Sequence, residues 1–172
     1  MANDAAAREA ALQDYLRELG LDTIQVEHEA VMTVDEAIAT LPPMDGCGTK
    51  NLFLRDGKGR RHFLVVVPHL RRVDIGALAR ALDVSRLGMA SPERLLRHLG
   101  VTPGAVGLLS LFNDDQGAVE LVIDREVWQA GRVLTHSLRN TATLSLAHAS
   151  LERFLAACSH PARVIDVPVA AG

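Results

Sequence analysis

Residues 50–67, "KNLFLRDGKGRRHFLVVV", contain two apolar and β-branched runs on either side of a glycine-rich segment. The residues from Lys50 to Arg55 and from Arg61 to Val67 favour strands. Between them, "DGKG" supplies the residues that a tight turn requires. The stretch therefore predicts a β-hairpin, and the rest of the chain is interpreted outward from it.

The segment just before this hairpin, "MDGCGTK" at residues 44–50, begins like a phosphate-binding loop. A nucleotide P-loop places its lysine at the start of a helix, after a strand and a longer glycine spacing. Here Lys50 instead begins a predicted strand, which excludes the P-loop. Lys50 is therefore a polar residue at the start of a predicted strand whose following apolar residues enter the core.

On the N-terminal side, the apolar spacing predicts a helix over residues 5–19 and a short strand over 23–29. Thr33 precedes Glu36 by three residues, which is a capping-box signature for a short helix over 34–41. On the C-terminal side, we expect a helix over 72–84 with Asp74 as N-cap. A second helix is expected over 91–100, with Ser91 as N-cap, Pro92 in its first turn and Gly100 at its end.

Residues 78–87, "LARALDVSRL", resemble the first half of a helix-turn-helix. A recognition helix after them would contain Gly88 and Pro92, and Pro92 would break it. We therefore expect no binding to DNA.

The last third of the chain is rich in β-forming residues, and strands outnumber helices overall. This favours one α+β domain over residues 1–172, with a mixed, curved β-sheet and flanking helices. A turn at 113–117 is expected to join the first two strands of this part. The predicted strands cover 106–112, 118–124, 132–138, 140–146 and 162–169, and a helix covers 148–158.

Composition excludes several classes of protein. Apolar residues make up 48% and charged residues 23%, which is ordinary for a globular domain. No apolar run approaches the roughly 18 residues of a membrane span, and acids stand where a secretory signal would be apolar. With only two distant cysteines, a disulfide framework is not expected. We expect a cytoplasmic protein without a membrane partner.

The charges are distributed unevenly. Residues 1–54 hold ten acidic and three basic residues, whereas 55–97 hold ten basic and four acidic ones. An asymmetry of this size is compatible with a phosphate-facing side and equally with a solvated surface.

Few residues of the sequence suggest a catalytic or metal-binding role. The seven histidines and two cysteines have no zinc-site spacing, so we expect no metal, and no GxSxG elbow is present. Cys47 has the character of a small packing residue rather than a nucleophile. The residues without a structural explanation are Lys50, His136, Asn140 and the tight loop formed by Gly100, Pro103 and Gly104.

Five motifs occur in order: "KNLFLRD", "HFLVVV", "LLRHLGVTPGAV", "FND" before "LVID", and "HSLRNTAT" before "LERFL". In this order they resemble the prolyl-tRNA editing proteins (ProX), the free-standing YbaK-like aminoacyl-tRNA deacylases. The resemblance runs from about His28 to Val167. It implies a fold like the editing domain inserted in bacterial prolyl-tRNA synthetases.

The resemblance also implies an activity, which is hydrolysis of the ester of a mischarged tRNA, most often alanine on proline tRNA, without metal or cofactor. The tRNA would be the partner, with prolyl-tRNA synthetase as a candidate second partner. Transferred position by position, the implied catalytic residues are Lys50, Gly104 and His136, and the implied substrate-binding residues are His28, Asn51, Gly100, Pro103 and Asn140.

At three places the sequence differs from the residues usual in the family, and these differences leave the size of the amino-acid pocket undetermined. "AVGLLSLFND" lacks the threonine and proline often found after the loop, Ser137 stands where a proline is common, and Met89 where an aromatic is usual. Cysteine or serine on tRNA is therefore an alternative substrate. A non-catalytic module that binds a synthetase or tRNA is the alternative of a different class.

Overall fold

The computed structural model describes residues 2–30, 36, 39 and 43–171. The capping box and most of the helix predicted over 34–41 lie outside the described residues. The elements are α1 (Ala2–Glu18), β1 (Thr23–Glu27), β2 (Cys47–Asp56), β3 (His62–Pro68), α3 (Ile75–Ala81), β4 (Leu87–Met89), α4 (Pro92–Leu99), the 3₁₀ helix η1 (Leu108–Asn113), β5 (Val119–Asp124), α5 (Arg125–Gln129), β6 (Arg132–His136), β7 (Ala142–Ala147), α6 (His148–Ala157) and β8 (Ala162–Ile165).

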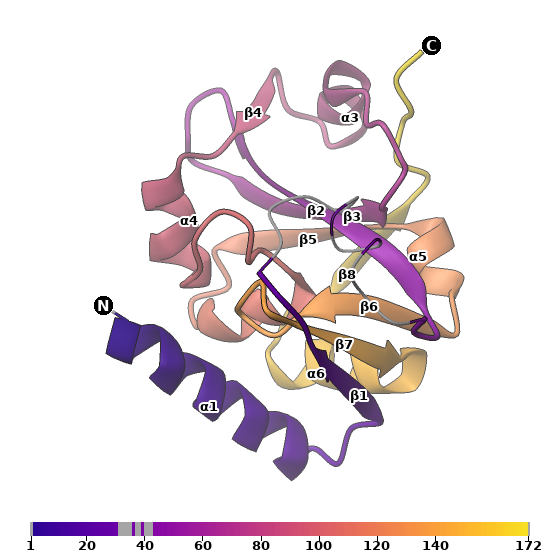
Figure 1. The fold of residues 1–172 in the computed structure, drawn as a ribbon. Coiled ribbons are helices and arrows are strands. Elements are labelled where there is room, and N and C mark those ends of the chain that lie inside the picture. The colour runs from indigo at the N-terminus through magenta and orange to yellow at the C-terminus, as the bar shows by residue number, and fades with distance from the viewer. Residues whose placement is uncertain (1, 31–35, 37–38, 40–42, 172) are drawn as a thin grey trace.

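The strands form one mixed sheet in the order β1-β7-β6-β2-β3-β5-β8, with β4 also paired to β2 (Figure 1). Adjacent strands β2–β3 and β6–β7 are antiparallel hairpins, whereas β2–β6, β3–β5 and β5–β8 are parallel. The predicted hairpin at 50–67 and the α+β class with a mixed sheet are confirmed.

Strand β2 belongs to two parts of this sheet. One edge pairs with β3, and the opposite edge pairs with β6 only at Cys47 and Gly48 and with β4 only at 54–56. Within the part of the chain that the structure describes, no strand pairs with that edge between Thr49 and Phe53. The sheet therefore divides at the position of Lys50.

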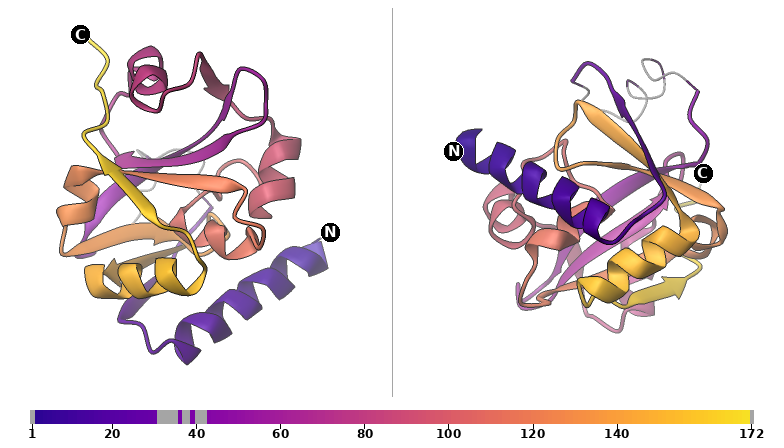
Figure 2. Two further views of the ribbon diagram at one scale, coloured as in Figure 1. Left: turned by 180° about the vertical axis from the view of Figure 1, so that it is seen from behind. Right: turned by 90° about the horizontal axis from the view of Figure 1, so that it is seen from below.

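Strand β3 is buried on both faces, which explains its unbroken apolar sequence. Leu64 and Val66 face the larger core cluster, which also takes residues from α1, α4, η1 and α6. Val65 and Val67 face a smaller cluster together with α3. Figure 2 shows α1 and α6 side by side against the end of the sheet opposite α3.

The strand predicted over 106–112 is wrong, because this segment forms η1. Its leucines are buried on all sides, and such a run lacks the alternation that separates a strand from a helix. The turn predicted at 113–117 is present at 115–116, but it joins η1 to β5 rather than two neighbouring strands, since β5 pairs in parallel with β3 and β8. Strand β4 and helix α5 were not predicted, and β4 occupies the place where a helix-turn-helix needs its second helix.

The predicted helix caps are confirmed. Asp74 and Ser91 accept hydrogen bonds from the first turns of α3 and α4, and Gly100 ends α4 with φ +66°. No helix among the described residues is long and apolar enough to cross a bilayer.

A histidine cluster ties the β2–β3 hairpin to α4. The His62 ring lies 4.2 Å from that of His98, centroid to centroid, and its Nε2 lies 3.0 Å from Nη1 of Arg94. A guanidinium only donates hydrogen bonds, so Nε2 must accept and the ring is neutral. Burial, with His98 and Arg94 adding to it, lowers the pKa of His62 to about 4.

This cluster predicts a loss of stability in mild acid. Between pH 6.5 and about 4 the unfolded chain binds a proton at His62 that the folded chain does not, so the free energy of unfolding falls as the pH is lowered, by up to about 3 kcal/mol. Urea unfolding at several pH values, compared between wild type and His62→Gln, measures this. His62→Gln should flatten the dependence; parallel curves for wild type and His62→Gln would contradict it.

Candidate active site

Lys50 and His136 lie on one face of the sheet. Strands β2 and β6 run parallel, and Gly48 pairs with Leu134. Lys50 and His136 each follow these paired residues by two positions, so their side chains share a face. This face is opposite to the one on which Val133 enters the larger core cluster.

Two further histidines reach the same face. Thr143 of β7 pairs with His136, and its Oγ1 lies 2.9 Å from Nε2 of His28. The Nδ1 atom of His28 lies 2.7 Å from the carbonyl oxygen of Glu29, so Nδ1 carries the hydrogen. The His69 ring packs against Gly48, where a Cβ would lie 2.7 Å from its Nδ1.

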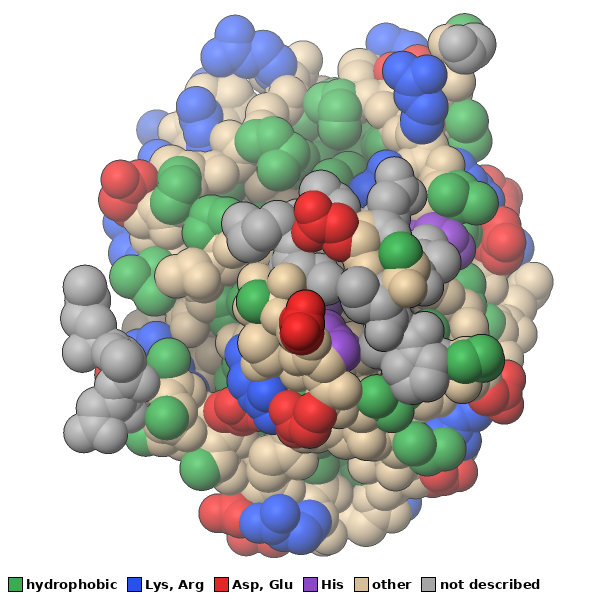
Figure 3. Space-filling view, viewed as in Figure 1, with side chains coloured by type: hydrophobic (Ala, Val, Ile, Leu, Met, Phe, Trp, Pro, Cys, Tyr) green, Lys and Arg blue, Asp and Glu red, His purple; other side chains and the backbone are tan. Residues whose placement is uncertain are grey.

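We call Lys50, His136, Thr143, His28 and His69 the polar face. Figure 3 shows histidine side chains at the surface near the middle of the view and toward its right-hand edge. Gly48, which in sequence suggested a phosphate loop, instead leaves room for the His69 ring. His69 and Thr143 were missed from sequence, although the alternation of polar and apolar residues in 141–146 pointed to a polar strand face.

Lys50 is held but not neutralised. Its Nζ donates a hydrogen bond to the carbonyl of Arg71. Burial lowers its pKa, and the charge of Arg72 adds to this. No carboxylate of the described residues lies within ion-pair distance of Nζ. An ammonium has three N–H donors, so this group can still donate to an anionic or polar ligand.

His136 is a neutral imidazole at neutral pH. Burial lowers its pKa and outweighs a hydrogen bond with the backbone of Ala142, which acts in the opposite direction; the charge of His28 adds to the lowering. Its Nδ1 is buried and has no hydrogen-bond partner among the described residues. Such a ring can hydrogen-bond a hydroxyl, but it does not add a positive charge.

The loop after α4 is fixed onto β6 beside His136. The backbone N–H of Leu108 donates to Oγ1 of Thr135 at 3.1 Å, and a Cβ on Gly107 would lie 2.8 Å from that oxygen and 3.2 Å from the His136 nitrogen. Three residues earlier, Gly104 has φ +93°. Gly107 was not among the predicted site residues, and a glycine within an apolar run was the available signal.

Two predicted substrate-binding residues are not brought to the polar face. Gly100 ends α4, accepts a hydrogen bond from Nη1 of Arg8 at 3.2 Å, and borders a pocket of about 360 Å³ with Arg97. Asn51 follows Lys50, so its side chain points to the opposite face, where its Oδ1 is buried without a described partner.

Pro103 is exposed in the loop, and Asn140 directly precedes the Thr141–Ala142 entry to β7. The substrate-binding roles of Gly100, Pro103, Asn51 and Asn140 stay predictions.

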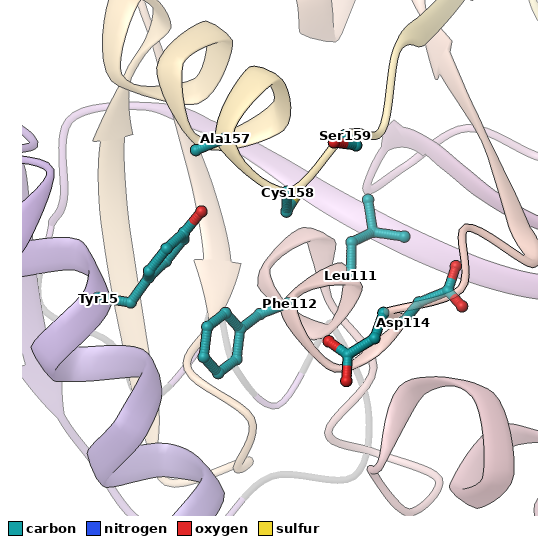
Figure 4. A pocket seen from close by; sticks show the side chains of 8 residues that line it. Tyr15, Leu111, Phe112, Asp114, Ala157, Cys158 and Ser159 are labelled. Atoms are coloured by element: carbon teal, nitrogen blue, oxygen red, sulfur yellow. The ribbon is translucent and has the colours of Figure 1, made fainter.

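A second pocket, of about 310 Å³, lies between α1, η1 and the end of α6 (Figure 4). Tyr15, Phe112, Asp114 and Cys158 line it, and none of the predicted site residues does. Burial raises the pKa of the Cys158 thiol to about 11 and also raises that of Cys47. Both thiols are therefore protonated at neutral pH and are poor nucleophiles.

The described residues contain no group of three or more His, Cys, Asp or Glu side chains placed to hold a metal ion. The chemistry that this arrangement supports is thus binding by an ammonium and by the neutral imidazole of His136, next to a glycine-containing loop.

Residues 28–154 match the family model of the aminoacyl-tRNA editing domain. The chain belongs to this family. It is 39% identical over 151 residues to the zebrafish (Danio rerio) prolyl-tRNA synthetase associated domain-containing protein 1, covering 87% of this chain and 82% of that protein. It is 32% identical over 164 residues to the prolyl-tRNA editing protein ProX of Acetoanaerobium sticklandii, covering 95% and 99%.

Among solved structures, the editing domain is similar in fold to a proposed trans-editing enzyme for prolyl tRNA synthetase. The TM-score is 0.71 at 21% identity, over 94% of this chain and 97% of the other. The matched range of the family model contains Lys50, His28 and His136 but begins after α1.

The close approach at Gly107 gives a testable prediction. Gly107→Ala places a methyl group against Thr135 and His136, so we expect a loss of about 1–3 kcal/mol in unfolding free energy and displaced amide resonances at 135–136. Gly131→Ala, whose Cβ would meet nothing within 4 Å, is the matched control. Wild-type stability and unchanged resonances in Gly107→Ala would contradict the contact.

Proposed function

We propose that this editing domain hydrolyses the ester bond of mischarged tRNA, with alanine on proline tRNA as its preferred substrate. The observation that carries the proposal is the polar face, where Lys50 and His136 lie beside the part of the β2 edge that pairs with no strand of the described residues. Family membership and the name of the relative ProX support the reaction class.

The reaction needs little from the protein. An aminoacyl ester is already reactive and a free ribose hydroxyl lies beside it, so positioning and charge stabilisation suffice without a protein nucleophile or a metal. Water adds to the ester carbonyl, the bond to the ribose oxygen breaks, and the free amino acid and the tRNA leave.

Each part of the site has an assigned task. The Lys50 ammonium binds the terminal phosphate or the adenosine that bears the ester. Backbone N–H groups of the loop at 100–104, such as that of Gly104, face the developing oxyanion, and neutral His136 hydrogen-bonds the ribose. The N–H of Gly100 is not among them because it donates to the carbonyl of Leu96, and Pro103 has none. We assign no general base to the protein, because the substrate's own hydroxyl assists the water.

Specificity would come from a small pocket that admits alanine and excludes proline by size. Cysteine or serine on tRNA remains the alternative substrate, given the departures after Gly104. Prolyl-tRNA synthetase, which produces the mischarged tRNA, is the protein partner that we propose, with the cytoplasm as the place of reaction. A non-catalytic tRNA-binding module is the alternative function.

The first test compares Lys50 with a basic residue that lies outside both the polar face and the basic segment 55–97. Lys50→Ala should abolish deacylation of alanyl proline tRNA and leave the fold intact, whereas Arg17→Ala, on exposed α1, should keep wild-type activity. Hydrolysis of proline tRNA charged separately with alanine, cysteine, serine or proline is measured for wild type and both variants.

If wild type releases cysteine or serine from the tRNA and does not release alanine, the proposed mechanism stands and the preferred substrate is a different one. Full activity in Lys50→Ala would contradict the role assigned to Lys50. Absence of hydrolysis of any charged tRNA by wild type would favour the non-catalytic module.

The second test concerns the basic segment 55–97. Lys and Arg side chains gather at the upper end of the view in Figure 3. Two basic residues of the segment 55–97 already have acidic partners: Arg61 pairs with Glu120, and Arg71 pairs with Asp124 and Glu126. Arg60 and Arg72 are exposed, so they are better placed to contact phosphates.

We expect Arg60→Glu with Arg72→Glu to weaken tRNA binding and to reduce the slope of log K against log salt, because fewer counterions are released. Arg17→Glu, on exposed α1, is the control. Titrations at several salt concentrations measure the slope. An unchanged slope would mean that the basic segment is only a solvated surface.

A further inference from the structure

Helix α1 lies outside the range that the family model matches, yet it is an integral part of the core. Leu12 and Leu16 are buried, and the Tyr15 ring packs 5.0 Å from that of Phe112 and 6.3 Å from that of Phe154. The helix thus packs against η1 and α6, and this packing sets where its polar residues lie.

Two successive residues of α1 contact two different loops of the candidate site. Arg8 donates from Nη1 to the carbonyl oxygen of Gly100 at 3.2 Å. Oε1 of Glu9 accepts a hydrogen bond from Nε of Arg139 at 2.6 Å and another from the hydroxyl of Ser137 at 3.3 Å. One turn of helix therefore joins the loop after α4 to the loop between β6 and β7.

The two residues that Glu9 contacts, Ser137 and Arg139, flank Leu138, whose backbone conformation is unusual. Leu138 has φ +70°, a left-handed conformation that is unfavourable for a leucine. Such a conformation persists only where its surroundings impose it. Ser137 is fully buried, and Arg139 is further held by Glu27 and by Oγ1 of Thr141.

His136 immediately precedes this segment. A change at 137–139 therefore alters the direction in which its imidazole is presented on the polar face.

We propose that Glu9 is a positioning residue that fixes residues 136–140, and that Arg8 and Glu9 together hold the two loops of the site in one relative arrangement. The proposal rests on the proposed function for its effect on catalysis, but not for its structural part. Glu9 acts through Ser137 and Arg139, and it contacts no reacting atom itself.

The test compares Glu9→Ala, Glu9→Gln and Arg8→Ala by amide chemical shifts and by steady-state deacylation. Glu9→Ala should stay folded, shift the amides of 136–140 and the His136 imidazole, and lower kcat on the order of tenfold or more with a smaller change in KM. Glu9→Gln keeps an acceptor oxygen for both partners and should recover most of the activity. Arg8→Ala should shift the amides of 99–104 and leave 136–140 in place.

Asp14→Ala is the matched control, because Asp14 lies on the same helix and pairs only with exposed Arg17 among the described residues. Unshifted amides at 136–140 in Glu9→Ala would overturn the proposal, and so would equal shifts in Asp14→Ala. If Glu9→Ala does not fold, Ser137→Ala and Glu9→Gln are judged by the same amide shifts.

The two proposals fail separately. If wild type hydrolyses no charged tRNA, the proposed function is wrong, while the chemical shifts of the Glu9 and Arg8 variants still decide whether α1 positions the loops. If wild type is active and Glu9→Ala has wild-type kcat, KM and shifts, only the role of Glu9 is wrong.

Discussion

The short parallel pairing between β2 and β6 is the constraint on which the candidate site depends. It covers only Cys47 and Gly48, after which the two strands separate, and β2 regains a partner on that edge at 54–56. Lys50 stands at this interruption in the pairing.

Desolvation gives the site its chemical character. It lowers the pKa of both Lys50 and His136, and no described carboxylate compensates the ammonium. A lysine held in this way by a backbone carbonyl has a strong tendency to bind an anionic or polar ligand, since a ligand oxygen replaces lost water. The neutral imidazole of His136 on the same face hydrogen-bonds hydroxyl groups without repelling the ammonium. A nucleotide end with phosphate and ribose fits both properties.

Sequence patterns located most elements and several site residues, but not their grouping. Periodicity and caps identified α1, α3 and α4, and the motif order predicted site roles for Lys50, His136 and His28, which the structure places on the polar face. Periodicity failed at 106–112, where burial on all sides removed any period. Asn51 and Gly100 adjoin candidate site residues in sequence but lie away from the polar face, and their roles stay predictions. Gly107, Thr143 and His69 were missed because only contacts between distant segments bring them beside Lys50 and His136: strand pairing for Thr143 and loop packing for Gly107 and His69.

The sequence by itself determined the local structure: the hairpin at 50–67, the helix caps at Asp74, Ser91 and Gly100, and the family to which the chain belongs. These depend on residues close together in the chain, whose turn, capping and alternation preferences are visible in the letters. Only the tertiary structure decided that Lys50 and His136 share a face, that β5 pairs in parallel with β3, and that Glu9 contacts both sides of Leu138. The reason is that each of these contacts joins segments far apart in the chain, and their register is set by burial of the whole sheet rather than by any local pattern.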